Sequence, residues 1–225
     1  MSNFTRWTLG VSLALFITVA PAVYFRYHYT DHKRLRVVEP GVLYRSGQLS
    51  ADGFTEAVLR YQIRTIINAM DEVPDPDLAS NWWRLGTIKE SELCRQLGVR
   101  YVHLKPDTVS RRTIPGGRPE AIDQFLEILD DPTNHPVLLH CRAGLHRTGV
   151  LTAVYRMEHG GCTAAGCRRP FTQLEALDEM KELGFGDFFC TSANDYVKQY
   201  VLTYRPRARK SDTRLTRSEG GAQID

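Results

Sequence analysis

One short stretch of the chain combines a cysteine, an arginine and a hydroxyl at a spacing that can support nucleophilic catalysis. Residues 137–149 read VLLHCRAGLHRTG, in which five residues separate Cys141 from Arg147. The hydrophobic run predicts a buried strand with Cys141 at its carboxyl end, where open α/β sheets bind ligands. A short loop and then a helix are predicted to follow. The sequence therefore places a potential nucleophile at a ligand-binding edge.

The residues between Cys141 and Arg147 are suited to form an anion-binding loop. In a loop of this length the backbone N–H groups can converge on one point beside the N-terminus of the next helix. Such a loop would stabilise the Cys141 thiolate and hold three oxygens of a phosphate at the same time. Arg147 would bind two of these oxygens bidentately and counter charge in the transition state. The predicted substrate-binding residues are Arg142, Ala143, Gly144, Leu145, His146 and Arg147.

The sequence HCRAGLHRTG resembles the H-C-x5-R-[ST]-G loop of the protein tyrosine and dual-specificity phosphatases. This resemblance implies hydrolysis of a phosphate monoester through a phosphocysteine on Cys141. It also implies that Thr148 donates a hydrogen bond to the Cys141 sulfur and assists its departure, while His140 braces the loop from behind. The alternative is a buried, inert cysteine on a strand–helix turn, which would not require Arg147 or the Thr148–Gly149 pair.

A general acid is expected outside this loop, because the leaving alkoxide or phenoxide needs a proton. Asp107 is the candidate. It follows a predicted strand at residues 101–104, and Lys105-Pro106-Asp107 resembles the Trp-Pro-Asp acid loop of tyrosine phosphatases, with Lys105 in place of the tryptophan. The polar segment 105–118 is predicted to act as a lid. The alternative for Asp107 is an ordinary turn residue after a proline.

Between residues 37 and 204, short hydrophobic runs alternate with helical patterns, which predicts an α/β fold with a central, mostly parallel sheet flanked by helices. Strands are expected at residues 42–44, 65–67, 101–104 and 137–139. Helical periodicity follows Ser50 and Pro119 and recurs in the C-terminal third, which is predicted to be mostly helical. We interpret residues 37–204 as one phosphatase domain.

The two ends of the chain differ from this domain. We interpret residues 1–36 as a membrane anchor and juxtamembrane segment, because the uncharged run 7–25 would span about 28 Å as a helix, close to the hydrocarbon thickness of a bilayer. More basic residues follow this run than precede it, which predicts a single-pass membrane protein with a cytoplasmic catalytic domain. A cleaved signal peptide is the alternative, since residues 20–22 have cleavage-site spacing. Residues 205–225 are predicted to form a disordered basic tail.

The composition argues against several other classes of protein. The formal net charge of +3 is small and gathers toward the two ends of the chain, so no nucleic-acid partner is expected. Five cysteines without a C-x-x-C pair indicate neither a disulfide framework nor a zinc site. No His/Asp cluster shows metal-ligand spacing, so we expect neither a metal nor another cofactor.

The sequence leaves the substrate open. Residues 41–47 and 63–68 are similar to the opening of atypical dual-specificity phosphatases, including those acting on inositol phosphates, and they are expected to pack or turn. Arg142 and His146 make the loop basic, as in phosphatases with highly charged ligands. We expect a phosphorylated protein as substrate, with an inositol phosphate or phosphoinositide as the alternative. Two other functions are considered. The intact Cys141 argues against a non-catalytic phosphate-binding module at the membrane. The Arg-Thr-Gly ending of the loop argues against a rhodanese-type sulfurtransferase.

Overall fold

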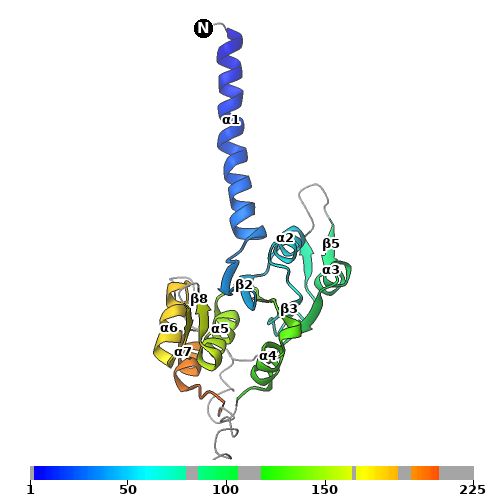
Figure 1. Ribbon diagram of the computed structural model, residues 1–225. Helices are drawn as coiled ribbons and strands as arrows, with labels where there is room; N and C mark the ends of the chain where they lie inside the picture. Colours follow the sequence, from blue (N-terminus) through cyan, green and yellow to red (C-terminus); the bar gives the residue numbers. More distant parts are fainter. Residues whose placement is uncertain (1–2, 80–85, 106–117, 164–165, 187–193, 208–225) are drawn as a thin grey trace, which may run out of the picture.

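The computed structural model describes residues 3–79, 86–105, 118–163, 166–186 and 194–207. They form a five-stranded sheet with helices on both faces, two short two-stranded ribbons, and a long N-terminal helix that projects from the domain (Figure 1). The predicted α/β fold with a mostly parallel central sheet is confirmed.

The central sheet has the strand order β1-β2-β7-β3-β6. Its strands are β1 (Arg36–Glu39), β2 (Leu43–Gly47), β7 (Val137–Cys141), β3 (Thr65–Asn68) and β6 (Arg100–His103). Only the β1–β2 pair is antiparallel, so the other strands end at one edge. In the parallel register Gly47 lies beside Cys141 and Asn68 beside His140. The end of β7 is therefore bordered on both sides by the ends of other strands.

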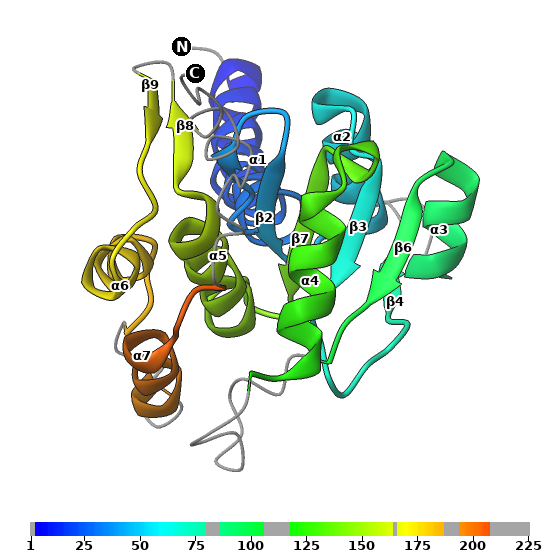
Figure 2. The ribbon, with the colours of Figure 1, turned by 60° about the horizontal axis from the view of Figure 1, so that its bottom comes forward.

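Helices cover both faces of the sheet (Figure 2). One face carries α2 (Ala51–Tyr61) and α3 (Glu90–Leu97), and the other carries α4 (Glu120–Asp130) and α5 (His146–His159), with α6 (Gln173–Glu182) and α7 (Asn194–Thr203) packed against α5. Alternate residues of β7 serve the two faces: Leu138 packs with α2 and α3, whereas Leu139 packs with α4 and α5. This alternation follows from the two-residue period of a strand and explains why β7 is buried throughout.

The expected strands and helices are present, with a few differences. β2 runs three residues further than predicted, to Gly47, because it pairs with β7 as far as Cys141. The sequence analysis did not predict α3 or the two ribbons, which are β4 (Asp77–Ala79) with β5 (Thr87–Lys89) and β8 (Gly161–Thr163) with β9 (Gly166–Arg168). A 3-10 turn (Pro132–Asn134) precedes β7.

The N-terminal apolar run forms one helix, α1 (Asn3–Arg26), that continues into a π-helical turn (Tyr27–Asp31). The helix is long and apolar enough to cross a membrane, and no residue of α1 is buried within the protein. The predicted boundary at residue 36 falls at the first residue of β1. The segment before it therefore leads directly into the sheet, and the membrane topology stays a prediction.

Candidate active site

Cys141 is the last residue of β7, and its sulfur lies inside a tight turn of the following loop. The backbone N–H of Gly144 donates a hydrogen bond to Cys141 Sγ at 3.2 Å. Gly144 has φ +71°, and a Cβ at this position would lie 2.5 Å from the Gly47 nitrogen and 2.7 Å from the Ser46 carbonyl carbon. Only glycine combines this backbone conformation with so close an approach to β2. The loop is thus wrapped against the neighbouring strand.

Three consecutive carbonyl groups of the loop are held from outside the loop. Arg142 O accepts a hydrogen bond from the Gln48 N–H at 3.3 Å, Ala143 O from Arg34 Nη1 at 3.0 Å, and Gly144 O from Arg45 Nη2 at 2.8 Å. In a planar trans peptide the carbonyl and the following N–H point in opposite directions. Outward carbonyls therefore turn the N–H groups of residues 143–145 inward, as the Gly144 bond to sulfur shows. This is the converging set of donors that an anion site requires.

Arg45 is a supporting residue that the sequence analysis did not recognise. It lies in the segment that was expected only to pack or turn, and it does pack, being 3% exposed within β2. Burial is the main cause that lowers the pKa of Arg45, to about 10, so the guanidinium remains charged at neutral pH. Its bond to Gly144 O places a buried cation directly behind the loop. Such a cation favours an anion, or a thiolate, on the other side.

Arg147 lies in the first turn of α5 and is held by two carboxylates that follow β3. Its Nη1 and Nη2 donate to the two oxygens of Glu72 at 3.0 and 2.7 Å, and Nη2 lies 2.9 Å from Asp71 Oδ2. The hydrogen bonds from Arg147 lower the pKa of the Glu72 carboxyl to about 2. Among the described residues, the buried Nε has no hydrogen-bond partner. The guanidinium therefore keeps its Nε–H available on a fixed plane.

Asp71 and Glu72 were also missed by the sequence analysis, although a signal for them existed. Both residues follow a predicted strand, β3, and the carboxyl ends of parallel strands meet at one edge. Two acidic residues a few positions after such a strand are expected to lie near a cationic residue that follows the neighbouring strand.

Thr148 and His140 lie beside the loop, each fully buried. In this structure Thr148 Oγ1 has no hydrogen-bond partner among the described residues, so the bond to sulfur that the resemblance implies is not formed. Its role in releasing the sulfur stays a prediction. His140 Nε2 lies 2.7 Å from Glu90 Oε1, and its ring meets Phe54 edge-on at 5.1 Å. His140 thus ties the end of β7 to α2 and α3.

The remaining loop residues differ in exposure. Leu145 is buried, His146 is half-buried near the ring of Phe185, and Arg142 is exposed. Burial and then the neighbouring Arg34 lower the pKa of Lys33, with Arg142 contributing in the same direction. Within the described part of the chain, no carboxylate forms an ion pair with Lys33, Arg34 or Arg142. These three residues, which we call the cationic rim, concentrate positive charge beside the loop.

Asp107, the predicted acid, lies outside the described residues, so its position relative to Cys141 stays a prediction. The strand that precedes it, β6, ends at His103, in the same parallel group as β7. His103 Nε2 lies 2.8 Å from the Met70 carbonyl oxygen, just before the two carboxylates that bind Arg147. The chain thus enters the predicted lid from the edge of the sheet that carries the loop.

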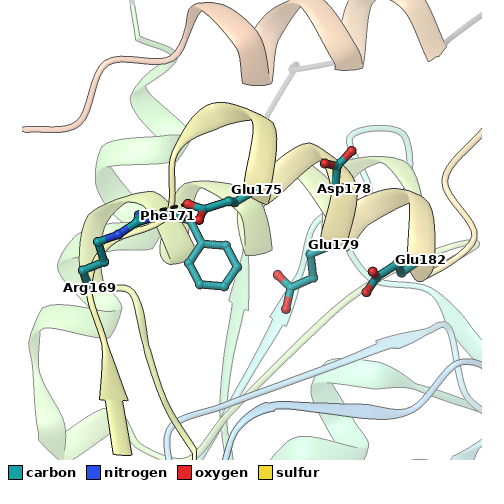
Figure 3. A pocket seen from close by; sticks show the side chains of 6 residues that line it. All are labelled: Arg169, Phe171, Glu175, Asp178, Glu179 and Glu182. Carbon is teal, nitrogen blue, oxygen red and sulfur yellow. Dashed lines mark hydrogen bonds and ion pairs between the residues drawn. The ribbon is translucent and has the colours of Figure 1, made fainter.

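A cavity of about 580 Å³ lies elsewhere, on the outer side of α6 (Figure 3). It is lined by Arg169, Phe171, Glu175, Asp178, Glu179 and Glu182. Three of its carboxylates are engaged in ion pairs, Glu175 with Arg169, Glu179 with Arg156 and Asp178 with Lys181. None of the lining residues belongs to the Cys141 loop. The cavity is therefore separate from the candidate site.

Fold and loop together define a phosphatase of the tyrosine and dual-specificity superfamily. The family described as DSP-PTPase phosphatase fused to NAD+ kinase matches residues 21–182, well over half of the chain, and the chain belongs to this family.

Two curated relatives from Arabidopsis thaliana are similar to parts of the chain. Inositol diphosphatase DSP3 is 30% identical over 129 residues, which is 57% of this chain and 56% of the relative. Inositol diphosphatase DSP4 is 44% identical over 46 residues, which is 20% of this chain and 23% of the relative. The matches thus span between about a quarter and just over half of the relatives' length.

Solved structures share the fold. The core catalytic domain of the PP-IP phosphatase SIW14 from S. cerevisiae superposes with a TM-score of 0.55 at 20% identity, over 77% of this chain and 86% of that one. P. aeruginosa TpbA superposes with a TM-score of 0.51 at 22% identity, over 76% and 89% of the two chains. At these identities the likeness concerns the fold alone.

Proposed function

We propose that the protein hydrolyses phosphate monoesters through a phosphocysteine intermediate on Cys141. The Cys141 thiolate attacks phosphorus, the S–P bond forms, and the ester P–O bond breaks as the leaving oxygen takes a proton. Water then attacks phosphorus, the S–P bond breaks, and inorganic phosphate leaves with the thiolate restored. The observation that carries this proposal is the row of three outward carbonyls, which turns the N–H groups of residues 143–145 to the other side of the loop, where that of Gly144 donates to the Cys141 sulfur.

Arg147 is proposed to bind the transferring phosphoryl group. Its Nε is buried and has no partner among the described residues, and a phosphate oxygen is an acceptor that would satisfy it. Glu72 occupies the two terminal nitrogens and so fixes the plane of the guanidinium. Positive charge held in place before the reaction stabilises the equatorial oxygens without reorganisation. Thr148 Oγ1, which is also buried and has no partner within the described ranges, is proposed to donate to the sulfur as it leaves.

Asp107 is proposed as the general acid that protonates the leaving oxygen. Glu72 is unsuited to this task, because a carboxyl with a pKa of about 2 is ionised at neutral pH. Asp107→Ala is expected to slow the hydrolysis of aryl phosphates with poor leaving groups and to spare those with good ones. Asp178→Ala, an exposed acid on α6, serves as the control. Equal effects of Asp107→Ala on every leaving group would remove Asp107 from the mechanism.

We infer that the preferred substrate carries more than one phosphate group. Within the cationic rim, Lys33 and Arg142 place two positive charges beside the loop that can meet a second phosphate, because the Arg34 guanidinium donates to the Ala143 carbonyl instead. Two curated relatives are inositol diphosphatases, which supports a polyphosphorylated small molecule. A phosphorylated protein is the second candidate, supported by the match of the loop to that of tyrosine and dual-specificity phosphatases.

The two candidates are separated by comparing kcat/KM for phosphotyrosine peptides, phosphoserine peptides, inositol phosphates and diphosphoinositol phosphates. Arg142→Met is expected to lower kcat/KM for a multiply phosphorylated substrate by about tenfold, because a phosphate contact from an arginine is charge-assisted. The same variant should change kcat/KM for p-nitrophenyl phosphate far less. A higher kcat/KM for phosphotyrosine peptides, insensitive to Arg142→Met, would establish the protein substrate instead.

The N-terminal helix α1 is proposed to anchor the domain to a membrane as a single span, with the domain in the cytoplasm. Its length, apolar surface and lack of buried residues support this proposal. Residues 20–22 lie within the unbroken helix, so cleavage there would leave a short helical stub before the domain. Carbonate-resistant membrane fractionation tests the anchor, and N-terminal sequencing of the purified protein tests cleavage. A protein that begins after residue 22 would overturn the anchor.

A further inference from the structure

The segment between α1 and β1 is built into the catalytic domain rather than linking it loosely to the helix (Figure 1). The Ser50 N–H donates to Thr30 O at 3.2 Å, and Ser50 Oγ donates to the Asp31 carboxylate. His32 Nε2 lies 3.0 Å from Glu56 Oε1. At Gly53 a Cβ would lie 2.2 Å from the Asp31 carbonyl oxygen, so the turn rests directly on the backbone of α2.

From α2 the segment continues to the edge of the sheet that carries Cys141. The Gly47 N–H donates to Lys33 O at 2.7 Å, and Gly47 is the residue beside Cys141 in the register of β2 and β7. The next residue, Arg34, has φ +51°, which is uncommon for a residue other than glycine. A hydrogen bond of 3.1 Å from the Leu35 N–H to His32 O closes the turn that contains it. The turn directs the Arg34 guanidinium toward the loop.

Arg34 contacts one particular peptide group of the loop. Its Nη1 donates to Ala143 O at 3.0 Å, and the N–H of the same peptide group, on Gly144, donates to Cys141 Sγ at 3.2 Å. Because the peptide is planar, fixing the direction of its carbonyl fixes the direction of its N–H. The other two outward carbonyls are held by Arg45 and by the Gln48 backbone, both within or next to β2. The donor for the central carbonyl comes from the N-terminal segment.

We propose that Arg34 is a positioning residue for the phosphate-binding loop, so that the segment joining the N-terminal helix to the domain is part of the active site. This inference rests on the proposed function, because it concerns the N–H groups that would bind the transferring phosphoryl group. Arg34 acts through the 143–144 peptide and not by touching the substrate. A domain that begins at residue 37, the boundary expected from the sequence, therefore lacks one of the three supports of the loop.

The test compares Arg34→Met, Arg34→Lys and Arg60→Met with the wild-type full-length protein in detergent. Arg60 is an exposed arginine on α2, so its removal changes the charge without touching the loop. With p-nitrophenyl phosphate, Arg34→Met is expected to lower kcat about tenfold, since a charged donor is lost from the loop. KM should change less than about threefold, and inhibition by orthovanadate, which mimics the transition state, should weaken about as much as kcat.

The conservative variant separates positioning from a merely structural role. Arg34→Lys keeps a charged donor and should recover kcat to within about threefold of the wild type, as should Arg60→Met. If Arg34→Met does not fold, Arg34→Gln, which keeps an uncharged donor, replaces it in the same comparison. A higher KM at unchanged kcat would make Arg34 a substrate contact and overturn the inference. If the wild-type protein is active and Arg34→Met has the same kcat, the inference is also overturned. If the wild-type protein has no phosphatase activity, the proposed function itself is overturned.

Discussion

The guanidinium of Arg147 and the carboxylate of Glu72 face each other through two hydrogen bonds, of 3.0 and 2.7 Å. The two residues are 75 positions apart in the sequence and meet because β7 and β3 are neighbours in the sheet. The pair fixes the plane of the guanidinium and leaves Nε without a partner in the part of the protein that the structure describes. Glu72 is thus placed to orient the arginine before a phosphate arrives.

Removal of the Glu72 carboxylate should therefore impair catalysis. Glu72→Ala is expected to lower kcat/KM for p-nitrophenyl phosphate by about tenfold, because two charge-assisted hydrogen bonds that orient Arg147 are lost. Glu92→Ala is a matched control, since Glu92 also binds an arginine, Arg95, through both oxygens but lies on α3. Steady-state kinetics on the two variants checks this expectation. If Glu72→Ala and the wild type have the same kcat/KM, Arg147 does not need Glu72 for its orientation.

The same pair predicts a pH dependence of stability. The pKa of the Glu72 carboxyl is lowered from 4.5 to about 2, so its contribution to the free energy of unfolding is present above about pH 4.5 and lost as the pH falls toward 2. The side chain is 65% exposed, so the contribution stays below about 1 kcal/mol. Urea unfolding of the wild type and Glu72→Ala between pH 7 and pH 3 should show a difference that narrows only below pH 4.5. A difference that disappears between pH 8 and pH 6 would contradict this assignment.

Gly144→Ala should abolish turnover while leaving the fold in place. The new methyl group would meet the backbone of β2 at 2.5 Å, and the loop would have to move away from Cys141. We expect kcat/KM to fall by at least about a hundredfold, since displaced donors no longer match the transition state. Gly98→Ala is the control, because Gly98 has a similar φ of +68° but open space around it. That variant should lose about 1 kcal/mol of stability and keep its activity. Comparable kinetics for the two variants would refute the role given to the contact with β2.

The buried pair of His140 and Glu90 should matter for stability. Both side chains are 0% exposed, and their 2.7 Å contact joins the end of β7 to the start of α3. Glu90→Ala is expected to lower the free energy of unfolding by about 1–3 kcal/mol, because the buried His140 ring nitrogen loses its hydrogen-bond partner. Glu90→Gln, which keeps a hydrogen-bonding group, should cost clearly less. Chemical denaturation measures the free energy of unfolding of both variants. A decrease below about 1 kcal/mol for Glu90→Ala would show that the pair contributes little to stability.

The Cys141 loop and the parallel sheet could be predicted because both are encoded locally. A hydrophobic run ending in a cysteine, with an arginine after five further residues, indicates a strand, a loop and a helix without knowledge of the rest of the chain. The alternation of Leu138 and Leu139 between the two cores follows from the same local pattern.

The supports of the loop could not be predicted in this way. Arg45 and Arg34 donate to loop carbonyls from 99 and 109 positions away, and each uses a side chain to bind a backbone oxygen. The spacing of residues in the sequence does not indicate such contacts. In the sequence, the pattern around Arg45 indicates only a packing residue, and Arg45 is indeed buried. Arg34 is one of several basic residues that flank an apolar helix in the sequence. Their roles become visible only when β2 and β7 lie side by side.

The phosphocysteine itself can be detected by mixing the protein rapidly with a 32P-labelled phosphate monoester and stopping the reaction with denaturant. We predict that the label appears within the first turnover on a peptide that contains Cys141, and that wild-type protein then releases it as inorganic phosphate. Cys141→Ser should bind the same substrate but neither carry a thiol-linked label nor turn over. Continued turnover by Cys141→Ser, or a label on any other residue, would contradict the mechanism.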